Sequence, residues 1–185
     1  MHRILQPLPL LLLAVAIACS DANSLADPTV SNVVDTVTLG SIEGTPISVP
    51  SGFNITSGAV RIDQTDFEFV YNVRRLTDGT YQRVFLPRAT LGLTSSTADP
   101  GLQAREETFD GITRAPSNGY TADSAVPIQV GQRYVVRSRV VCANLGVPLY
   151  GKLEILGFQD STVTFQVLVD KNCGYRDLLL GLPEN

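Results

Sequence analysis

The strongest indication of the fold lies in the segment 131–176, which combines β-type residues with two cysteines. It contains three runs, QRYVVRSRVVC, YGKLEILGF and STVTFQVLVDKNC, and a turn with glycine and proline separates the first two. Apolar and polar residues alternate along much of these runs, as they do in strands that bury one face. We therefore predict three strands here, with Cys142 at the end of the first and Cys173 just beyond the third.

The segment 66–87 predicts a β-hairpin. Its first half alternates between a mostly polar set of residues and an apolar set, namely Phe67, Phe69, Tyr71 and Val73. Such a strand buries the apolar face and leaves the other face to solvent. The sequence Thr77-Asp78-Gly79-Thr80 has the Asp-Gly chemistry of a tight turn, and 81–86 returns as the partner strand before Pro87 ends it.

The other segments give weaker signals. Short runs of Val, Ile and Thr, cut by glycine and proline, predict short strands over 36–60, where Asn54-Ile55-Thr56 is interpreted as a turn and strand start. Residues 102–112 are predicted to form a short helix. The surrounding stretch 94–125 is our first candidate for a binding surface, because long loops in compact domains are often functional.

These patterns define a fold class. Residues 36–185 are predicted to form one all-β domain, an antiparallel β-sandwich or a pair of strongly twisted sheets, with at most one short helix. About 150 residues are enough to bury a substantial core in a single domain.

The first 18 residues are typical of an export signal. A short charged start is followed by an apolar run from Leu5 to Ala18, which is too short and too proline-rich to span a membrane. The run ends in Ala16-Ile17-Ala18-Cys19, which resembles the lipobox of bacterial lipoproteins. That resemblance implies cleavage before Cys19 and acylation of this residue, for example with palmitate, so that the chain is anchored to a membrane. An ordinary signal peptide that happens to contain a cysteine is the alternative.

The cysteine count agrees with export. Three cysteines leave one odd thiol in an exported chain, and a lipidated Cys19 together with a Cys142–Cys173 disulfide accounts for all three. Two buried free thiols are the alternative. Residues 19–35 are small and polar and are interpreted as a flexible tether, which places the domain at the cell envelope, on the outer membrane or facing the periplasm.

Composition excludes several kinds of chemistry. Removal of residues 1–18 takes away Arg3 and the only histidine, His2, so the 14 basic residues become 13 against 18 acidic ones and the net charge is −5. This balance does not favour a nucleic-acid partner. Without histidine the mature chain cannot form a Ser-His-Asp triad or a histidine-bearing zinc site. We therefore predict no enzymatic activity, no cofactor and no metal.

Some polar residues leave alternatives open. The cluster of Asp63, Asp66 and Glu68 is interpreted as a solvated strand face, with paired carboxylates of a carbohydrate-active enzyme as the alternative. A calcium site would use Asp63, Asp66 or Asp78. The arginine pairs Arg74/Arg75 and Arg137/Arg139 are candidates for anion binding, with surface strand positions as the simpler interpretation. Tyr120 and Tyr150 are candidates for stacking on a planar ligand, with core or turn packing as the simpler interpretation.

Four segments over residues 65–168 resemble the HmuY-like family of bacterial haem-carrier lipoproteins. They are TDFEFVYNVRRLTDG, FDGITRAPSNGYTAD, VGQRYVVRSR and YGKLEILGFQDSTVTFQ. The resemblance implies an all-β, lipid-anchored domain that faces the cell exterior or the periplasm. The best-known members of that family hold haem with two histidines, which the mature chain lacks, so only the fold and the anchoring are carried over.

The function predicted from sequence is that of an exported lipoprotein, a binding or structural module of the cell envelope. Its partners would be the membrane, through the lipid at Cys19, and an unidentified envelope protein or small ligand. A haem or other small-ligand carrier and a carboxylate-based carbohydrate-active enzyme remain as alternatives.

Overall fold

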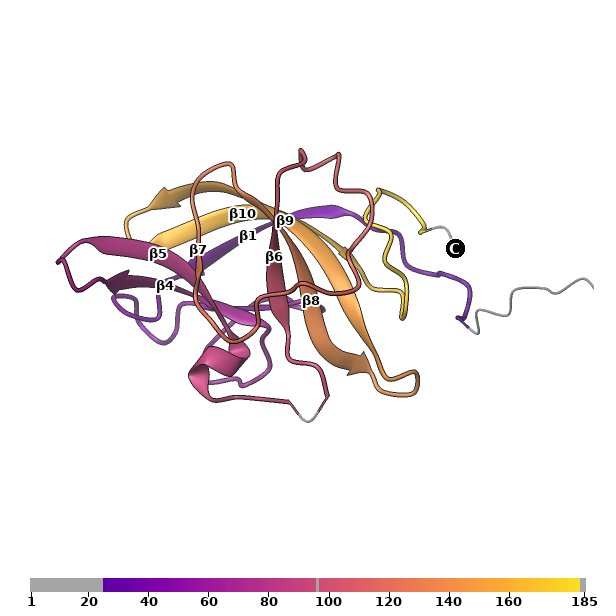
Figure 1. The fold of residues 1–185 in the computed structure, drawn as a ribbon, viewed down its shortest axis with the longest axis horizontal. Helices are drawn as coiled ribbons and strands as arrows, with labels where there is room; N and C mark the ends of the chain where they lie inside the picture. The colour runs from indigo at the N-terminus through magenta and orange to yellow at the C-terminus, as the bar shows by residue number, and fades with distance from the viewer. Residues whose placement is uncertain (1–24, 96, 184–185) are drawn as a thin grey trace, which may run out of the picture.

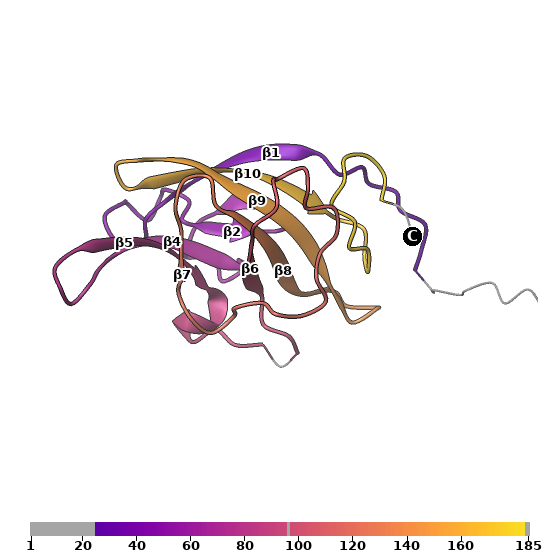
Figure 2. The ribbon, with the colours of Figure 1, turned by 45° about the horizontal axis from the view of Figure 1, so that its top comes forward.

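The computed structural model describes residues 25–95 and 97–183. Two antiparallel sheets of five strands each pack face to face (Figures 1 and 2). In the described ranges the only helical element is the short 3-10 helix η1 (Arg88–Leu91). The predicted all-β sandwich with at most one short helix is therefore confirmed.

The first sheet is built around the strands predicted from the segment 131–176. Its order is β1 (Val34–Gly40), β10 (Thr162–Asp170), β9 (Val147–Gln159), β8 (Arg133–Cys142) and β6 (Gly101–Arg105). Tyr134 of β8 pairs with Leu153 of β9, which pairs in turn with Val167 of β10. Because successive side chains alternate between the two faces, Val163, Phe165 and Val167 all point into the core, as predicted.

The second sheet contains the predicted hairpin. Its order is β3 (Gly58–Val60), β2 (Gly52–Asn54), β4 (Phe69–Arg75), β5 (Tyr81–Pro87) and β7 (Val126–Pro127). The hairpin register runs from Arg75 opposite Tyr81 to Phe69 opposite Pro87. Gly79 has a φ of +86° in the turn, a conformation that glycine adopts without steric cost.

Aromatic rings fill the space between the sheets. The ring of Phe69 lies 5.1 Å from Phe53 and 4.4 Å from Phe85, centroid to centroid. Phe165 of the opposite sheet meets Phe85 edge to face at 5.8 Å. All four side chains are almost completely buried. Such pairs add packing energy to the burial of a large apolar area, so this cluster holds the two sheets together.

The predicted helix over 102–112 is wrong. Residues 101–105 form strand β6, in which Leu102 pairs with Val136 of β8 and is 1% exposed. Thr121 crosses the other edge of β6, and its N–H donates to the carbonyl of Leu102 at 2.8 Å. Burial of Leu102 between the sheets and pairing on both edges outweigh the local helix preference.

Part of the stretch 94–125 covers the outer face of the first sheet, and its residues Phe109 and Asp110 line two hollows. Phe109, Ile112 and Ala115 pack on the outer face of the first sheet, against Val135, Tyr150, Leu168 and Leu178. Lys152 of β9 lies beneath this cover, where its Nζ donates to the carbonyl of Ile112 at 3.0 Å and lies 4.6 Å from the centre of the Phe109 ring. Burial lowers the pKa of Lys152.

The described part of the expected tether is bound to the domain. The hydroxyl of Tyr175 donates to the carbonyl of Ala26 at 3.1 Å, and the side chain of Asn172 accepts from the N–H groups of Thr29 and Val30 at 2.9 and 3.0 Å. Asn32 forms an antiparallel bridge with Gly181. Residues 26–35 are therefore part of the body, whereas the signal 1–18, Cys19 and residues 20–24 lie outside the described residues.

Candidate functional site

The carboxylates singled out in the sequence converge on an arginine of the opposite sheet. Glu68 lies just before β4, and its Oε2 accepts from the N–H of Ile55 at 2.9 Å. Its Oε1 lies 3.4 Å from Nη1 of Arg139 in β8, whose Nη2 forms an ion pair with the exposed Asp66. The interpretation of this face as solvated is therefore wrong for Glu68, which is only 1% exposed.

Burial is the main influence on the pKa values of Glu68 and Arg139. It raises the pKa of Glu68 to about 7, against the opposing effects of the hydrogen bond from Ile55 and the positive charge of Arg88. Burial also lowers the pKa of Arg139. Of the two carboxylates, only Asp66 reaches solvent, and it is paired with Arg139. The arrangement links the two sheets and does not present two accessible carboxylates to a substrate.

The remaining charged candidates are engaged at separate places. Asp63 pairs with Arg61 on the surface, and Asp78 accepts hydrogen bonds from Thr80 within the hairpin turn. Arg74 donates to Gln82 on the neighbouring strand. Within residues 25–95 and 97–183, no three His, Cys, Asp or Glu side chains are grouped so that they could hold a metal ion.

Arg137 and the two tyrosines belong to the packing of the first sheet. The Arg137 guanidinium lies 4.8 Å from the centre of the Tyr120 ring and donates to the carbonyl of Asp99 at 2.9 Å. Tyr120 and Tyr150 meet at 6.3 Å, and the Tyr120 hydroxyl donates to the carbonyl of Pro116. Tyr150 is 8% exposed, so the ring faces available for stacking on a ligand are already occupied by protein.

A cavity of about 190 Å³ lies at the side of the sandwich, between β1, β10 and the turn that joins β2 to β3. Its apolar lining includes Phe53, Ile55 and several valines, and its rim carries Asp35 and Lys171. Ile55 connects the cavity directly to the buried carboxylate, because its N–H binds Glu68.

The turn at the rim of this cavity is fixed by one side chain. Oδ1 of Asn54 accepts from the N–H and the hydroxyl of Thr56, at 2.8 and 2.6 Å, and from the N–H of Ser57 at 3.0 Å. Asparagine commonly stabilises turns in this way. The sequence predicted a turn here but gave no sign of the cavity, because the strands that complete its lining come from distant parts of the chain.

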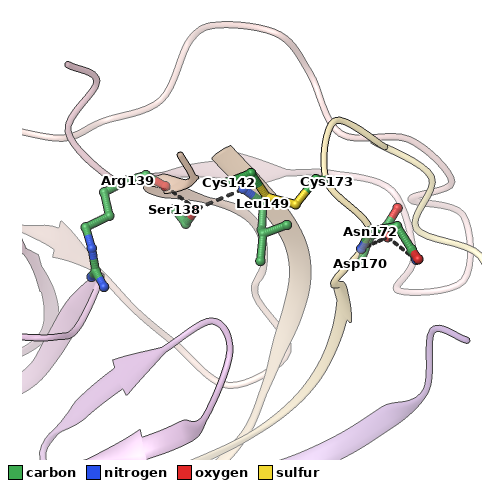
Figure 3. The surroundings of a disulfide bond; sticks show 7 residues. All are labelled: Ser138, Arg139, Cys142, Leu149, Asp170, Asn172 and Cys173. Atoms are coloured by element: carbon green, nitrogen blue, oxygen red, sulfur yellow. Dashed lines mark hydrogen bonds between the residues drawn. A yellow bond between two sulfur atoms is a disulfide. The ribbon is translucent and has the colours of Figure 1, made fainter. Parts of the chain in front are cut away.

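Cys142 and Cys173 meet at the end of the first sheet. A disulfide bond joins their sulfur atoms, as Figure 3 shows. β8 ends at Cys142, and Cys173 follows the end of β10. The neighbouring Asp170 accepts hydrogen bonds from Asn172, the residue that also holds Thr29 and Val30. The predicted pairing of the two cysteines is therefore confirmed, and it lies beside the contact between the two ends of the domain.

Comparisons with known proteins return no match. No family model matches the chain, and neither does any curated protein or any solved structure. In the part of the chain that the structure describes, no helix has the length and apolar character needed to cross a membrane. The fold and the site thus define the class of protein only as a two-sheet antiparallel β domain with a cross-linked end.

Proposed function

We propose that this chain is an exported lipoprotein whose β-sandwich serves as a binding or structural module at the cell envelope. Residues 1–18 act as the signal, and Cys19 carries the lipid that attaches the domain to the membrane. The buried Glu68 and the paired Asp66 offer no pair of accessible carboxylates, which favours a binding or structural role over the carbohydrate-active alternative.

The observation that supports this proposal best is the attachment of residues 26–32 to the C-terminal segment. The hydrogen bond from Tyr175 to Ala26, the hydrogen bond that Asn172 accepts from Thr29, and the bridge between Asn32 and Gly181 hold this part of the chain on the body. Only five residues then lie between Cys19 and Leu25. A lipid at Cys19 would hold one defined end of the domain at the membrane, the end opposite the β4–β5 hairpin (Figures 1 and 2).

Metabolic labelling tests the anchor. The full chain is expressed in a bacterium supplied with radiolabelled palmitate, and membrane and soluble fractions are separated. We expect label on the wild-type chain in the membrane fraction and none on Cys19→Ala, because only an amino-terminal cysteine at the cleavage site is acylated. Label that persists on Cys19→Ala, or a wild-type chain without label, would contradict the proposal.

A small-ligand carrier is the second candidate function, and the cavity beside Phe53 and Ile55 favours it. Its volume of about 190 Å³ is below the roughly 300–1,000 Å³ of pockets for drug-sized ligands, so the ligand would be smaller than a tetrapyrrole. Titration with haemin is therefore expected to leave the Soret band of free haemin unchanged. A shifted Soret band with saturable binding would restore the haem-carrier alternative.

A further inference from the structure

The exposed apolar residues of this domain gather at one end. Among the described residues, twelve large hydrophobic side chains are at least 36% exposed, and half of them come from two short segments. They form what we call the terminal patch: Val30, Val33, Val34, Leu179, Leu180 and Leu182. Such a concentration on an otherwise polar surface typically marks a contact with a partner or a membrane.

The two segments of the terminal patch are held together by the backbone. The N–H of Asn32 donates to the carbonyl of Gly181 at 2.7 Å, and the N–H of Gly181 donates back to Asn32 at 3.1 Å. The side chain of Asn32 also donates to the carbonyl of Leu179 at 3.1 Å. In both ribbon views the indigo start of the described chain and the yellow C-terminal segment lie side by side at the same end of the molecule (Figures 1 and 2).

The terminal patch is continuous with apolar residues below it. Val34, Leu179 and Leu180 line a hollow together with Phe109 and Leu168 of the outer core, and the charged residues Asp110 and Lys152 complete its lining. Leu180 is 68% exposed and Val33 is 63% exposed, so these side chains are presented outward at the rim. Because the backbone is held by hydrogen bonds and the apolar side chains are exposed, the terminal patch is a preformed apolar surface.

We infer that the terminal patch rests in the interfacial layer of the lipid bilayer, so that the domain lies against the membrane instead of extending away from it. The inference depends on the proposed lipid at Cys19. The six Cα–Cα steps from Cys19 to Leu25 span at most roughly 20–22 Å, and about 12–15 Å for a flexible chain, which keeps the terminal patch close to the lipid surface. Transfer of valine and leucine side chains from water into the interface is favourable.

The attraction is apolar and not electrostatic. The mature chain has a net charge of −5, and the exposed charges next to the terminal patch are of both signs, with Asp35 and Asp110 against Lys171. Anionic headgroups would therefore not be favoured over neutral ones. A neutral phosphatidylcholine surface is the appropriate probe, and contact with it should not depend on salt concentration.

The chain contains no tryptophan, so a single introduced tryptophan reports its own surroundings. Leu180→Trp places it in the terminal patch, and Tyr81→Trp is the matched control, because Tyr81 is 71% exposed in the hairpin at the opposite end. Each full chain is matured in bacteria, checked for the palmitate label, purified and reconstituted into phosphatidylcholine vesicles with or without brominated acyl chains.

We expect the tryptophan at position 180 to emit at shorter wavelength in vesicles and to be quenched several-fold more by brominated lipid than the one at position 81, at low and high salt alike. Labelled protein in which both positions are quenched equally by aqueous iodide and not by brominated lipid would overturn this inference alone. Emission at position 180 that is already shifted without vesicles would indicate self-association and would also overturn it. Chains without label that remain soluble would overturn the lipid anchor and the inference together.

Discussion

Burial of a single carboxylate, Glu68, makes the stability of the domain depend on pH. Its pKa is about 7 in the folded chain, above the ordinary value of 4.5, because solvent is excluded from it. A raised carboxylate pKa means that the folded state binds more protons between these two values. The contribution of Glu68 to the free energy of unfolding is therefore present in full below pH 4.5 and is lost as pH rises through 7.

Glu68→Gln should remove much of this pH dependence. The amide keeps an oxygen for the N–H of Ile55 but carries no charge, so the free energy of unfolding should fall by much less between pH 5 and pH 8, and what remains comes from other groups such as the buried Asp170, whose pKa burial also raises. In the wild type that fall should be on the order of 3 kcal/mol. Urea denaturation at several pH values measures it, with Asp63→Asn as a control for removal of an exposed carboxylate. An identical pH dependence in Glu68→Gln and wild type would contradict the assignment.

The burial of Glu68 was not visible in the sequence. Alternation correctly placed Phe69 and Tyr71 in the core and correctly placed Glu68 on the opposite face. The prediction that this face meets solvent was wrong, because Arg139 and the backbone of Ile55 cover it from distant parts of the chain. Periodicity identifies the face to which a side chain belongs but not what lies on that face.

At the level of elements, β6 depends on Gly101, where the segment that contains Tyr120 and Thr121 crosses close to the strand. A Cβ atom at Gly101 would lie 2.7 Å from the carbonyl oxygen of Thr121 and 3.0 Å from Cβ of Tyr120. Both neighbours are held in place, since Thr121 exchanges two backbone hydrogen bonds with Leu102. The close approach requires the absence of a side chain.

Gly101→Ala should therefore destabilise the domain by about 1–3 kcal/mol and increase hydrogen exchange at the Thr121 amide, because the crossing segment must move away. Gly157→Ala is the matched control, since this strand glycine of β9 has no atom within 4 Å of an added Cβ. The control should be neutral or slightly stabilising. Equal denaturation midpoints for the two variants would show that the crossing is not closely packed.

Elements with long and regular patterns were predictable, and the short strand β6 was not. The strands of 131–176 and the 66–87 hairpin have alternation over seven or more residues, and both were found as predicted. β6 has five residues, GLQAR, whose polar members suit a helix equally well. Its conformation is set by pairing with β8, which the local sequence does not encode.

At the scale of the whole molecule, the Cys142–Cys173 link closes a loop of 31 residues that contains β9 and β10. Replacing both cysteines with alanine should lower the free energy of unfolding by roughly 3–4 kcal/mol, because the unfolded chain regains the freedom of that loop. Denaturation with and without reductant measures the effect, and reduction should not alter the double variant. Mass spectrometry that finds two free thiols in the exported wild-type chain would contradict the bridge.

The two ends of the described part of the chain form one structural unit in the folded domain. Asn172 and Asn32 hold residues 29–32 against the C-terminal segment, next to the linked cysteines. The sequence predicted a flexible tether up to residue 35, because small polar residues without periodicity give no sign of a partner. The partner lies about 140 residues further along the chain.

The sequence by itself determined the all-β class, the main strands and the hairpin, because these depend on local alternation and turn chemistry, and it favoured the pairing of Cys142 with Cys173 through a residue count. Only the tertiary structure decided that Glu68 is buried beneath Arg139, that a small cavity opens beside Phe53, and that Val33 and Leu180 share one exposed surface. Each of these depends on contacts between segments far apart in the chain. Burial and proximity arise from the packing of the two sheets, and no short window of sequence contains both partners.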